Sequence, residues 1–270
     1  MTDAPIGVFD SGVGGLTVLR ALMAELPRER FIYLGDTARL PYGTKSRATV
    51  ARYAAQCAEA LGGYGLKCLV VACNTAAATS LPTIRERLEG MPVIGVIEPG
   101  AQAACEVSVS GHIAIIGTEG TVRGRAYEEA ILRRRHAARI SAVATQLFVA
   151  LAEEGVCTGP IPASVARHYL DSLFCEGRDT PDTLVLGCTH FPMLIDAIRE
   201  AIPEHIRIVD SAATTAIVVR QRIDSAGIAS CSAEGGVRFL ATDGAERFAR
   251  VGSSFLKRTI APADVEIIDL

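Results

Sequence analysis

The sequence predicts an α/β protein made of two similar halves, each built around a parallel sheet. Short runs that are apolar almost throughout, as in strands buried on both faces, alternate along the chain with segments of helical periodicity. These runs form two sets of four, and equivalent members lie about 107 to 115 residues apart. Any α/β chain could show such spacing, but cysteines that end equivalent runs favour a duplicated unit.

The first half contains four predicted strands, at 6–10, 31–36, 68–73 and 92–98. Between them, apolar residues at helical spacing indicate helices over 16–26 and 50–61. Ser80 followed by Pro82, with Gly90 downstream, indicates a short capped helix that ends at the glycine.

The second half contains four more predicted strands, at 112–118, 140–145, 183–188 and 206–211. Apolar spacing over 194–202 indicates a helix between the last two. The tail, 212–270, has two helical patterns and two further strand candidates, at 237–243 and in the final VEIID. It is too short for a third domain, and we expect it to complete one of the halves.

Composition excludes several classes of protein. A formal net charge of −3 argues against a chain that mainly neutralises nucleic-acid phosphates, so we expect no nucleic-acid partner. An apolar content of 49% excludes intrinsic disorder. We expect neither a secretory signal nor a membrane span, because the first residues lack a basic and apolar leader and no apolar run reaches about 18 residues. The predicted location is therefore the cytoplasm.

Cysteine usage narrows the chemistry. There are eight cysteines and no CxxC pair, which removes zinc ribbons and thioredoxin-type redox centres. In a reducing compartment any functional cysteine must then act as a single thiol. Six of them fall in helix or loop patterns and are interpreted as core or surface residues: Cys57, Cys68, Cys105, Cys157, Cys175 and Cys231.

Polar side chains gather where the predicted strands end. Ligands of open parallel sheets bind beyond the carboxyl ends of the strands, so these positions are the candidate site. They are Asp10-Ser11, Pro41-Tyr42-Gly43 after the second strand, Cys73-Asn74-Thr75, Thr118 to Thr121, and Cys188-Thr189-His190.

The first of these ends runs into a glycine-rich turn, DSGVGG, at 10–15. It matches neither GxGxxG nor a Walker loop, and a carboxylate suits the following helix start as well as a phosphate does. A tight turn without a ligand is the alternative. Asp10 by itself is more typical of a helix N-cap than of a catalytic residue.

Several readings of Cys73 and Cys188 remain open on this pattern. Both could be inert buried thiols of a binding module, or they could form a disulfide. With His190 they could form a metal site, although three ligands make a poor one. Cys188 and His190 could be a nucleophilic pair of a hydrolase or transferase. The reading that uses both thiols is acid–base catalysis on opposite faces of one carbon, which inverts a stereocentre.

Four motifs together resemble the aspartate/glutamate racemase family, in particular its glutamate racemases, over most of the chain. They are DSGVGGL at 10–16, LGDTARLPYG at 34–43, ACNTA at 72–76 and GCTHFP at 187–192. Members of this family interconvert L- and D-glutamate without a cofactor or metal and supply D-glutamate for peptidoglycan. Aspartate is the near rival as substrate.

The resemblance also implies residue roles. Cys73 is the expected base for the D-enantiomer and Cys188 for the L-enantiomer, assisted by Asp10 and His190 respectively. A family carboxylate near Cys188 corresponds to Glu153, although Ala150 stands where the family usually has proline. The expected substrate-binding residues are Asp10, Ser11, Pro41, Tyr42, Gly43, Asn74, Thr75, Thr118, Thr121, Thr189 and His190.

The family's architecture predicts two domains with the active site in the cleft between them. The first comprises 1–98 plus 208–270, so that the tail returns to it, and the second comprises 99–207. We also expect a small-molecule substrate, no membrane partner, and an assembly that can be a homodimer.

Overall fold

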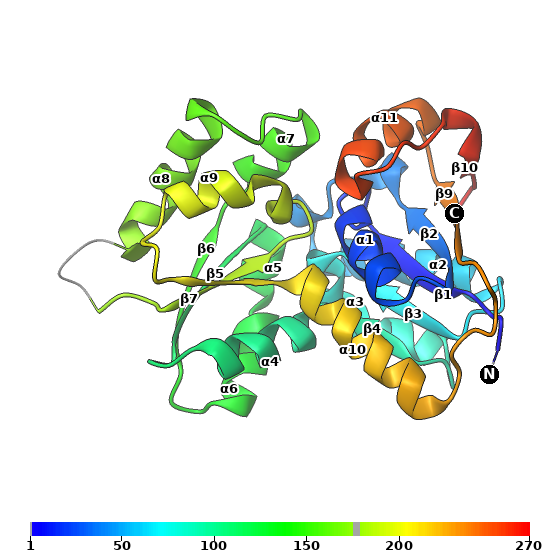
Figure 1. Ribbon diagram of the computed structural model, residues 1–270, viewed down its shortest axis with the longest axis horizontal. Coiled ribbons are helices and arrows are strands. Elements are labelled where there is room, and N and C mark those ends of the chain that lie inside the picture. The colour runs from blue at the N-terminus through cyan, green and yellow to red at the C-terminus, as the bar shows by residue number, and fades with distance from the viewer. Residues whose placement is uncertain (1, 175–178) are drawn as a thin grey trace.

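The computed structural model describes residues 2–174 and 179–270, which form two α/β units side by side (Figure 1). The first unit contains a six-stranded sheet in the order β10-β9-β2-β1-β3-β4, and the second a four-stranded sheet in the order β6-β5-β7-β8. Every strand pair is parallel. The strands are β1 Ile6–Asp10, β2 Arg30–Gly35, β3 Cys68–Val71, β4 Val93–Gly95, β5 His112–Gly117, β6 Arg139–Ala144, β7 Thr183–Gly187, β8 Arg207–Asp210, β9 Gly236–Ala241 and β10 Val265–Ile267.

The two sheets repeat one topology. The order β2-β1-β3-β4 of the first sheet corresponds strand by strand to β6-β5-β7-β8 of the second. The pairing is the one suggested by the sequence offsets, so the expected pseudo-symmetric α/β fold is confirmed. β9 and β10 have no counterpart in the second sheet and extend the first sheet beyond β2.

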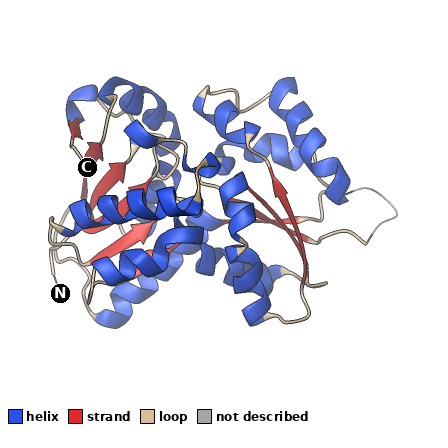
Figure 2. Ribbon diagram, turned by 180° about the vertical axis from the view of Figure 1, so that it is seen from behind, coloured by secondary structure: helices blue, strands red, loops and turns tan. Residues whose placement is uncertain are grey.

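Helices cover both faces of the sheets (Figure 2). This arrangement explains the apolar runs: all five residues of β1 and all five of β7 are buried, because each strand has helices above and below it. The helices are α1 Leu16–Glu25, α2 Arg47–Gly62, α3 Asn74–Arg87, α4 Ile97–Val107, α5 Glu119–Gly124, α6 Ala126–Arg134, α7 Leu147–Glu153, α8 Pro160–Phe174, α9 Ile195–Glu200, α10 Ser211–Ala226 and α11 Ala245–Leu256. Short 3-10 turns lie at Thr37–Arg39, Tyr42–Thr44, Phe191–Leu194 and Pro262–Asp264.

Two predicted elements differ in the structure. The strand expected over 92–98 ends at Gly95, and α4 begins at Ile97, because Pro99 falls in the first helical turn, where its missing N–H has no partner to lose. The helix expected to begin near Ser80 is instead α3, which starts at Asn74 and includes Pro82 in its interior. The apolar face of α3 is buried on both sides of the proline, and this burial outweighs the hydrogen bond that Pro82 removes.

The tail completes the first unit. β9 pairs with β2 along six residues, and α11 packs against α1. α10 lies against both α1 and α4, so it contacts helices of both units. The expected domain boundary between 207 and 208 falls inside β8, whose four residues pair with β7 in the second sheet. By strand pairing, the second sheet therefore extends to Asp210.

The described cysteines outside the candidate site range from buried to exposed. Cys57 and Cys68 are buried, Cys105 and Cys157 are half-buried, and Cys231 is exposed, while Cys175 lies outside the described residues. None of the helices in the described part of the chain is both long and apolar enough to cross a membrane.

Candidate active site

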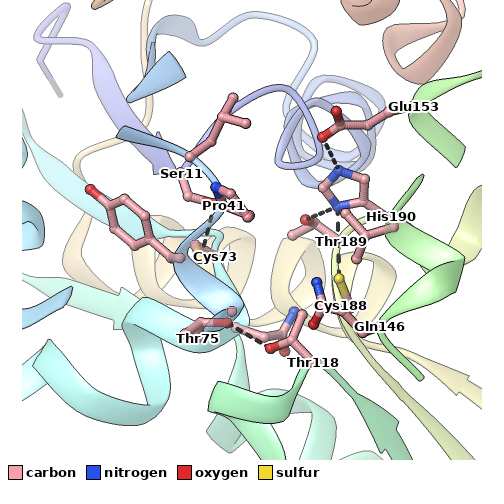
Figure 3. A pocket seen from close by; sticks show the side chains of 16 residues that line it. Ser11, Pro41, Cys73, Thr75, Thr118, Gln146, Glu153, Cys188, Thr189 and His190 are labelled. Carbon is pink, nitrogen blue, oxygen red and sulfur yellow. Dashed lines mark hydrogen bonds and ion pairs between the residues drawn. The ribbon is translucent and has the colours of Figure 1, made fainter. Parts of the chain in front are cut away.

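The carboxyl ends of β1 and β3 in the first sheet, and of β5 and β7 in the second, meet at one cavity between the units (Figure 3). Because the two sheets repeat one topology, equivalent strands deliver Cys73 and Cys188 to this cavity from opposite units. The cavity is lined by Ser11, Gly12, Leu40, Pro41, Tyr42, Gly43, Cys73, Asn74, Thr75, Thr118, Gln146, Val149, Glu153, Cys188, Thr189 and His190.

Cys73 caps the amino terminus of α3. The backbone N–H of Ala76 donates to its sulfur at 3.5 Å, and its thiol donates to Ser11 Oγ at 3.5 Å. Burial, together with the nearby charge of Asp10, raises the pKa of Cys73 to about 12. This cysteine is therefore a protonated thiol at neutral pH, ready to donate a proton.

Cys188 lies in a different setting. Its sulfur is 3.7 Å from Nδ1 of His190, whose Nε2 is 3.0 Å from Glu153 Oε1 (Figure 3). Arg247 Nη2 in turn donates to Glu153 Oε2 at 2.8 Å. These contacts form a continuous chain from a surface guanidinium to the sulfur.

This series of hydrogen bonds from Arg247 to Cys188 keeps His190 charged. Burial by itself lowers the pKa of His190, but hydrogen bonds to Cys188 and Glu153 and their charges outweigh it and raise the pKa to about 10. Burial likewise opposes ionisation of Glu153, yet His190 and Arg247 hold its pKa down to about 2. Cys188 therefore has an imidazolium partner, whereas Cys73 has a carboxyl group nearby.

Asp10 is completely buried and does not line the cavity. Gly12 N–H donates to its Oδ2 at 3.0 Å, and its Oδ1 has no hydrogen-bond partner among the described residues. Burial raises the pKa of Asp10, although the charge of His190 opposes the rise. Asp10 therefore lies behind the residues that line the cavity, close enough for its charge to act on Cys73 and His190.

The glycine-rich turn after β1 permits a close approach between the units. A Cβ on Gly14 would lie 2.4 Å from Cε1 of His190, and one on Gly15 would lie 2.5 Å from Cβ of Asp10. Thr17 Oγ1 also donates to the carbonyl of Thr189 at 2.8 Å. Two glycines of the turn therefore make room for these two expected catalytic side chains.

Three threonine hydroxyls bridge the two units beside the cavity. Oγ1 of Thr75 is 2.9 Å from that of Thr118 and 3.3 Å from that of Thr121, and the last two are 3.1 Å apart. Thr75 and Thr118 line the cavity, whereas Thr121 stands behind them. Thr189 lines it as well, with Oγ1 3.4 Å from His190 Nδ1.

The other expected binding residues differ in the polar groups that they have free to bind a substrate. Asn74 accepts a hydrogen bond from the Tyr127 hydroxyl at 2.8 Å, and its Nδ2 is buried with no partner in the part of the chain described. Ser11, Pro41 and Gly43 line the cavity. Tyr42 lines it too, but its hydroxyl donates to Asp36 in the core of the first unit.

Several lining residues and one supporting residue were missed by sequence reasoning. Gly12, Leu40, Gln146 and Val149 line the cavity, and Oε1 of Gln146 is buried without a partner among the residues described. Gln146 lies two residues after the end of β6, so the strand-end rule could have found it. Arg247 lies on the tail helix, far from every motif, and no signal in the sequence pointed to it. Within residues 2–174 and 179–270, no three His, Cys, Asp or Glu side chains are grouped so that they could hold a metal ion.

Proteins of known function are similar in sequence to nearly the whole of this chain. A family model described as Asp/Glu/Hydantoin racemase matches residues 6–219. The chain is 47% identical to a glutamate racemase of Geobacter metallireducens, over 93% of this chain and 92% of that protein. It is 42% identical to one of Neisseria gonorrhoeae, over 98% and 97% respectively.

Solved structures show the same fold. A glutamate racemase of Francisella tularensis in complex with D-glutamate superposes with a TM-score of 0.91 at 33% identity, covering 99% of this chain and 98% of that one. One from Bacillus anthracis gives 0.93 at 36% identity, covering 100% and 99%. The chain therefore belongs to the Asp/Glu/hydantoin racemase family, among its glutamate racemases, and is an isomerase.

Proposed function

We propose that this chain interconverts L- and D-glutamate by two-base proton transfer at Cα, with Cys73 and Cys188 as the bases. The observation that supports this most is the pair of cysteines at one cavity, one from each unit, in opposite electrostatic settings (Figure 3). A thiol that stays protonated and a thiol beside an imidazolium are the acid and the base that one inversion needs.

The different settings of the two cysteines suit the conversion that starts from L-glutamate. Cys188 as thiolate takes the Cα proton, the electron pair of the broken C–H bond remains on carbon and delocalises into the α-carboxylate, and Cys73 gives its proton to the opposite face. Cys188 is then a thiol and Cys73 a thiolate, which is the starting state for D-glutamate. Because the Cα proton is far less acidic than a thiol, the site must stabilise the carbanion while excluding water.

The lining supplies neutral groups to hold the substrate. Its donors include Ser11 Oγ, the unpartnered Nδ2 of Asn74 and the hydroxyls of Thr75, Thr118 and Thr189, which suit the two carboxylates. The α-ammonium instead needs acceptors. Both oxygens of Glu153 are already engaged, so the unpartnered Oε1 of Gln146 is the acceptor that the ammonium takes.

The decisive experiment follows racemisation in D₂O. Circular dichroism of L-glutamate with purified protein and no added cofactor should decay to zero, and solvent deuterium should enter at Cα. Cys73→Ala and Cys188→Ala should each abolish the decay, whereas Cys157→Ala, at a half-buried cysteine away from the cavity, should not. An optical signal that stays constant for hours with the unaltered protein would rule the proposal out.

The contact between Cys188 and His190 also suits a hydrolase or transferase that forms a covalent acyl-enzyme. That alternative predicts an acylated Cys188 by mass spectrometry and full activity in Cys73→Ala. Aspartate should be assayed in parallel, because one methylene in a pocket changes selectivity only about 10- to 200-fold.

Substrate entry requires the units to separate. Buried contacts cross between them at Thr75–Thr118 and at Asn74–Tyr127, so we propose a cycle of opening and closure. Small-angle scattering should show a more compact protein at saturating glutamate, and identical curves would contradict this motion.

In the cell we propose that the product serves peptidoglycan synthesis in the cytoplasm. Expression of the chain should restore growth of a bacterium that requires added D-glutamate, while Cys73→Ala should not. A homodimer remains a prediction, which sedimentation of the purified protein tests.

A further inference from the structure

The tail helix α11 connects the first unit to the Cys188 side of the site. α11 packs against α1, and Phe248 and Phe255 anchor it in the buried core. Arg247, on the same helix, donates to Glu153 Oε2 at 2.8 Å. Glu153 ends α7 of the second unit, so this ion pair crosses between the units.

Each oxygen of Glu153 has one partner. Oε1 faces Nε2 of His190 at 3.0 Å, and Oε2 accepts from Arg247. The side chain of Glu153 is only 14% exposed, whereas that of Arg247 is 44% exposed. Arg247 therefore orients a largely buried carboxylate from its solvent side, which leaves the other oxygen directed at the imidazole.

The same helix also limits the movement of the ring. Phe255 meets His190 edge-on, with ring centroids 5.2 Å apart. The charged or titratable groups that act on His190 come from three other elements: Asp10 at the end of β1, Cys188 after β7 and Glu153 on α7. Arg247 reaches the ring only through Glu153.

We propose that Arg247 is a positioning residue for proton transfer at Cys188. It positions Glu153 only when the two units are closed. The inference rests on the proposed racemase function. Arg247 fixes Glu153, Glu153 holds His190 as an imidazolium facing Cys188, and the imidazolium stabilises the thiolate. Because the first unit carries Arg247 and the second carries Glu153, opening the cleft breaks the first link. The thiolate of Cys188 is then less stabilised, so Cys188 holds its own proton and cannot take the Cα proton.

The test compares Arg247→Gln with Arg247→Lys and with Arg250→Gln. Arg250 is an exposed arginine on the same helix that forms no ion pair with the residues the structure describes, so its variant is the matched control. Since a partly exposed pair contributes modestly, kcat should fall about two- to fivefold in Arg247→Gln with a smaller change in KM. Lysine should restore part of the loss, and the control should match the wild type.

Two further readouts separate positioning from a general loss of structure. The ¹⁵N NMR titration of the His190 ring, assigned with His190→Asn, should shift to lower pH in Arg247→Gln. Added salt of about 0.5 M should slow the wild type more than this variant, because it screens an exposed pair. An unchanged His190 titration together with wild-type kcat would overturn the inference.

The experiments give different results when Arg247 has no role and when the protein is not a racemase. A wild type that racemises glutamate while Arg247→Gln behaves identically leaves the function standing and removes the role of Arg247. A wild type that never racemises glutamate removes the function, and the His190 titration still reports whether Arg247 acts on the ring.

Discussion

Replacing His190 by asparagine should remove the charge that stabilises a thiolate on Cys188. In the structure the ring lies between Cys188 and Glu153, at 3.7 and 3.0 Å. Asparagine can still hydrogen bond but carries no charge, so the substitution tests the imidazolium itself rather than the packing of the site.

The size of the effect follows from the titration of the ring. A pKa of about 10 instead of the ordinary 6.5 corresponds to about 5 kcal/mol in favour of the charged form. The hydrogen bonds and charges of Cys188 and Glu153 together outweigh burial in this shift, and losing a charged hydrogen-bond partner at the sulfur costs about 2 to 3 kcal/mol. The expected loss in kcat/KM at pH 8 is therefore about 30- to 160-fold. The two enantiomers have equal free energies, so the loss must be the same for L- and D-glutamate.

The assay is circular dichroism from both enantiomers between pH 6 and about 10.5, with His136→Asn, at an exposed histidine, as the control. Because the pKa of His190 is raised, the wild-type rate should hold below pH 9 and fall as His190 loses its proton near pH 10. In His190→Asn this alkaline fall should be absent, because no imidazolium remains to lose its proton. A variant within threefold of the wild type at pH 8, or one that keeps the alkaline fall, would refute this reasoning.

Three further outcomes are expected. Gly14→Ala should reduce kcat/KM as strongly as His190→Asn, because its Cβ would lie 2.4 Å from the ring; normal activity would show that the ring can shift freely. Gln146→Met should weaken inhibition by 4-aminobutyrate, which has the ammonium group, about tenfold. Inhibition by glutarate, which lacks the ammonium group, should not change. Equal losses for both inhibitors would mean that a carboxylate, and not the ammonium, binds at Gln146. Urea unfolding should show Glu153→Gln about 2 to 3 kcal/mol less stable than the wild type between pH 4.5 and 6.5. This difference in stability should disappear as pH falls from 4.5 towards 2, where Glu153 becomes protonated. It should also disappear as pH rises from 6.5 towards 10, where His190 becomes neutral. A difference that does not depend on pH would contradict the ion pair.

Much of the fold could be predicted from local pattern. Runs such as LVV before Cys73 and LVLG before Cys188 are apolar because both faces of each strand are covered, and that pattern also placed the two thiols at strand ends. Prediction failed where burial outweighed a local signal. Pro82 indicated a helix start, yet α3 runs through it because its apolar face is buried on both sides of the proline.

The sequence by itself determined which residues stand at the carboxyl ends of the strands, and so most of the chemical groups of the site. Only the tertiary structure decided how those groups are charged. The pKa of Cys73 depends on burial and on the charge of Asp10 from another strand, and the pKa of His190 depends on burial, on Cys188 and on Glu153 from another helix. Arg247 illustrates the same limit: nothing local marks it, because its role arises only where α11 of one unit meets Glu153 of the other.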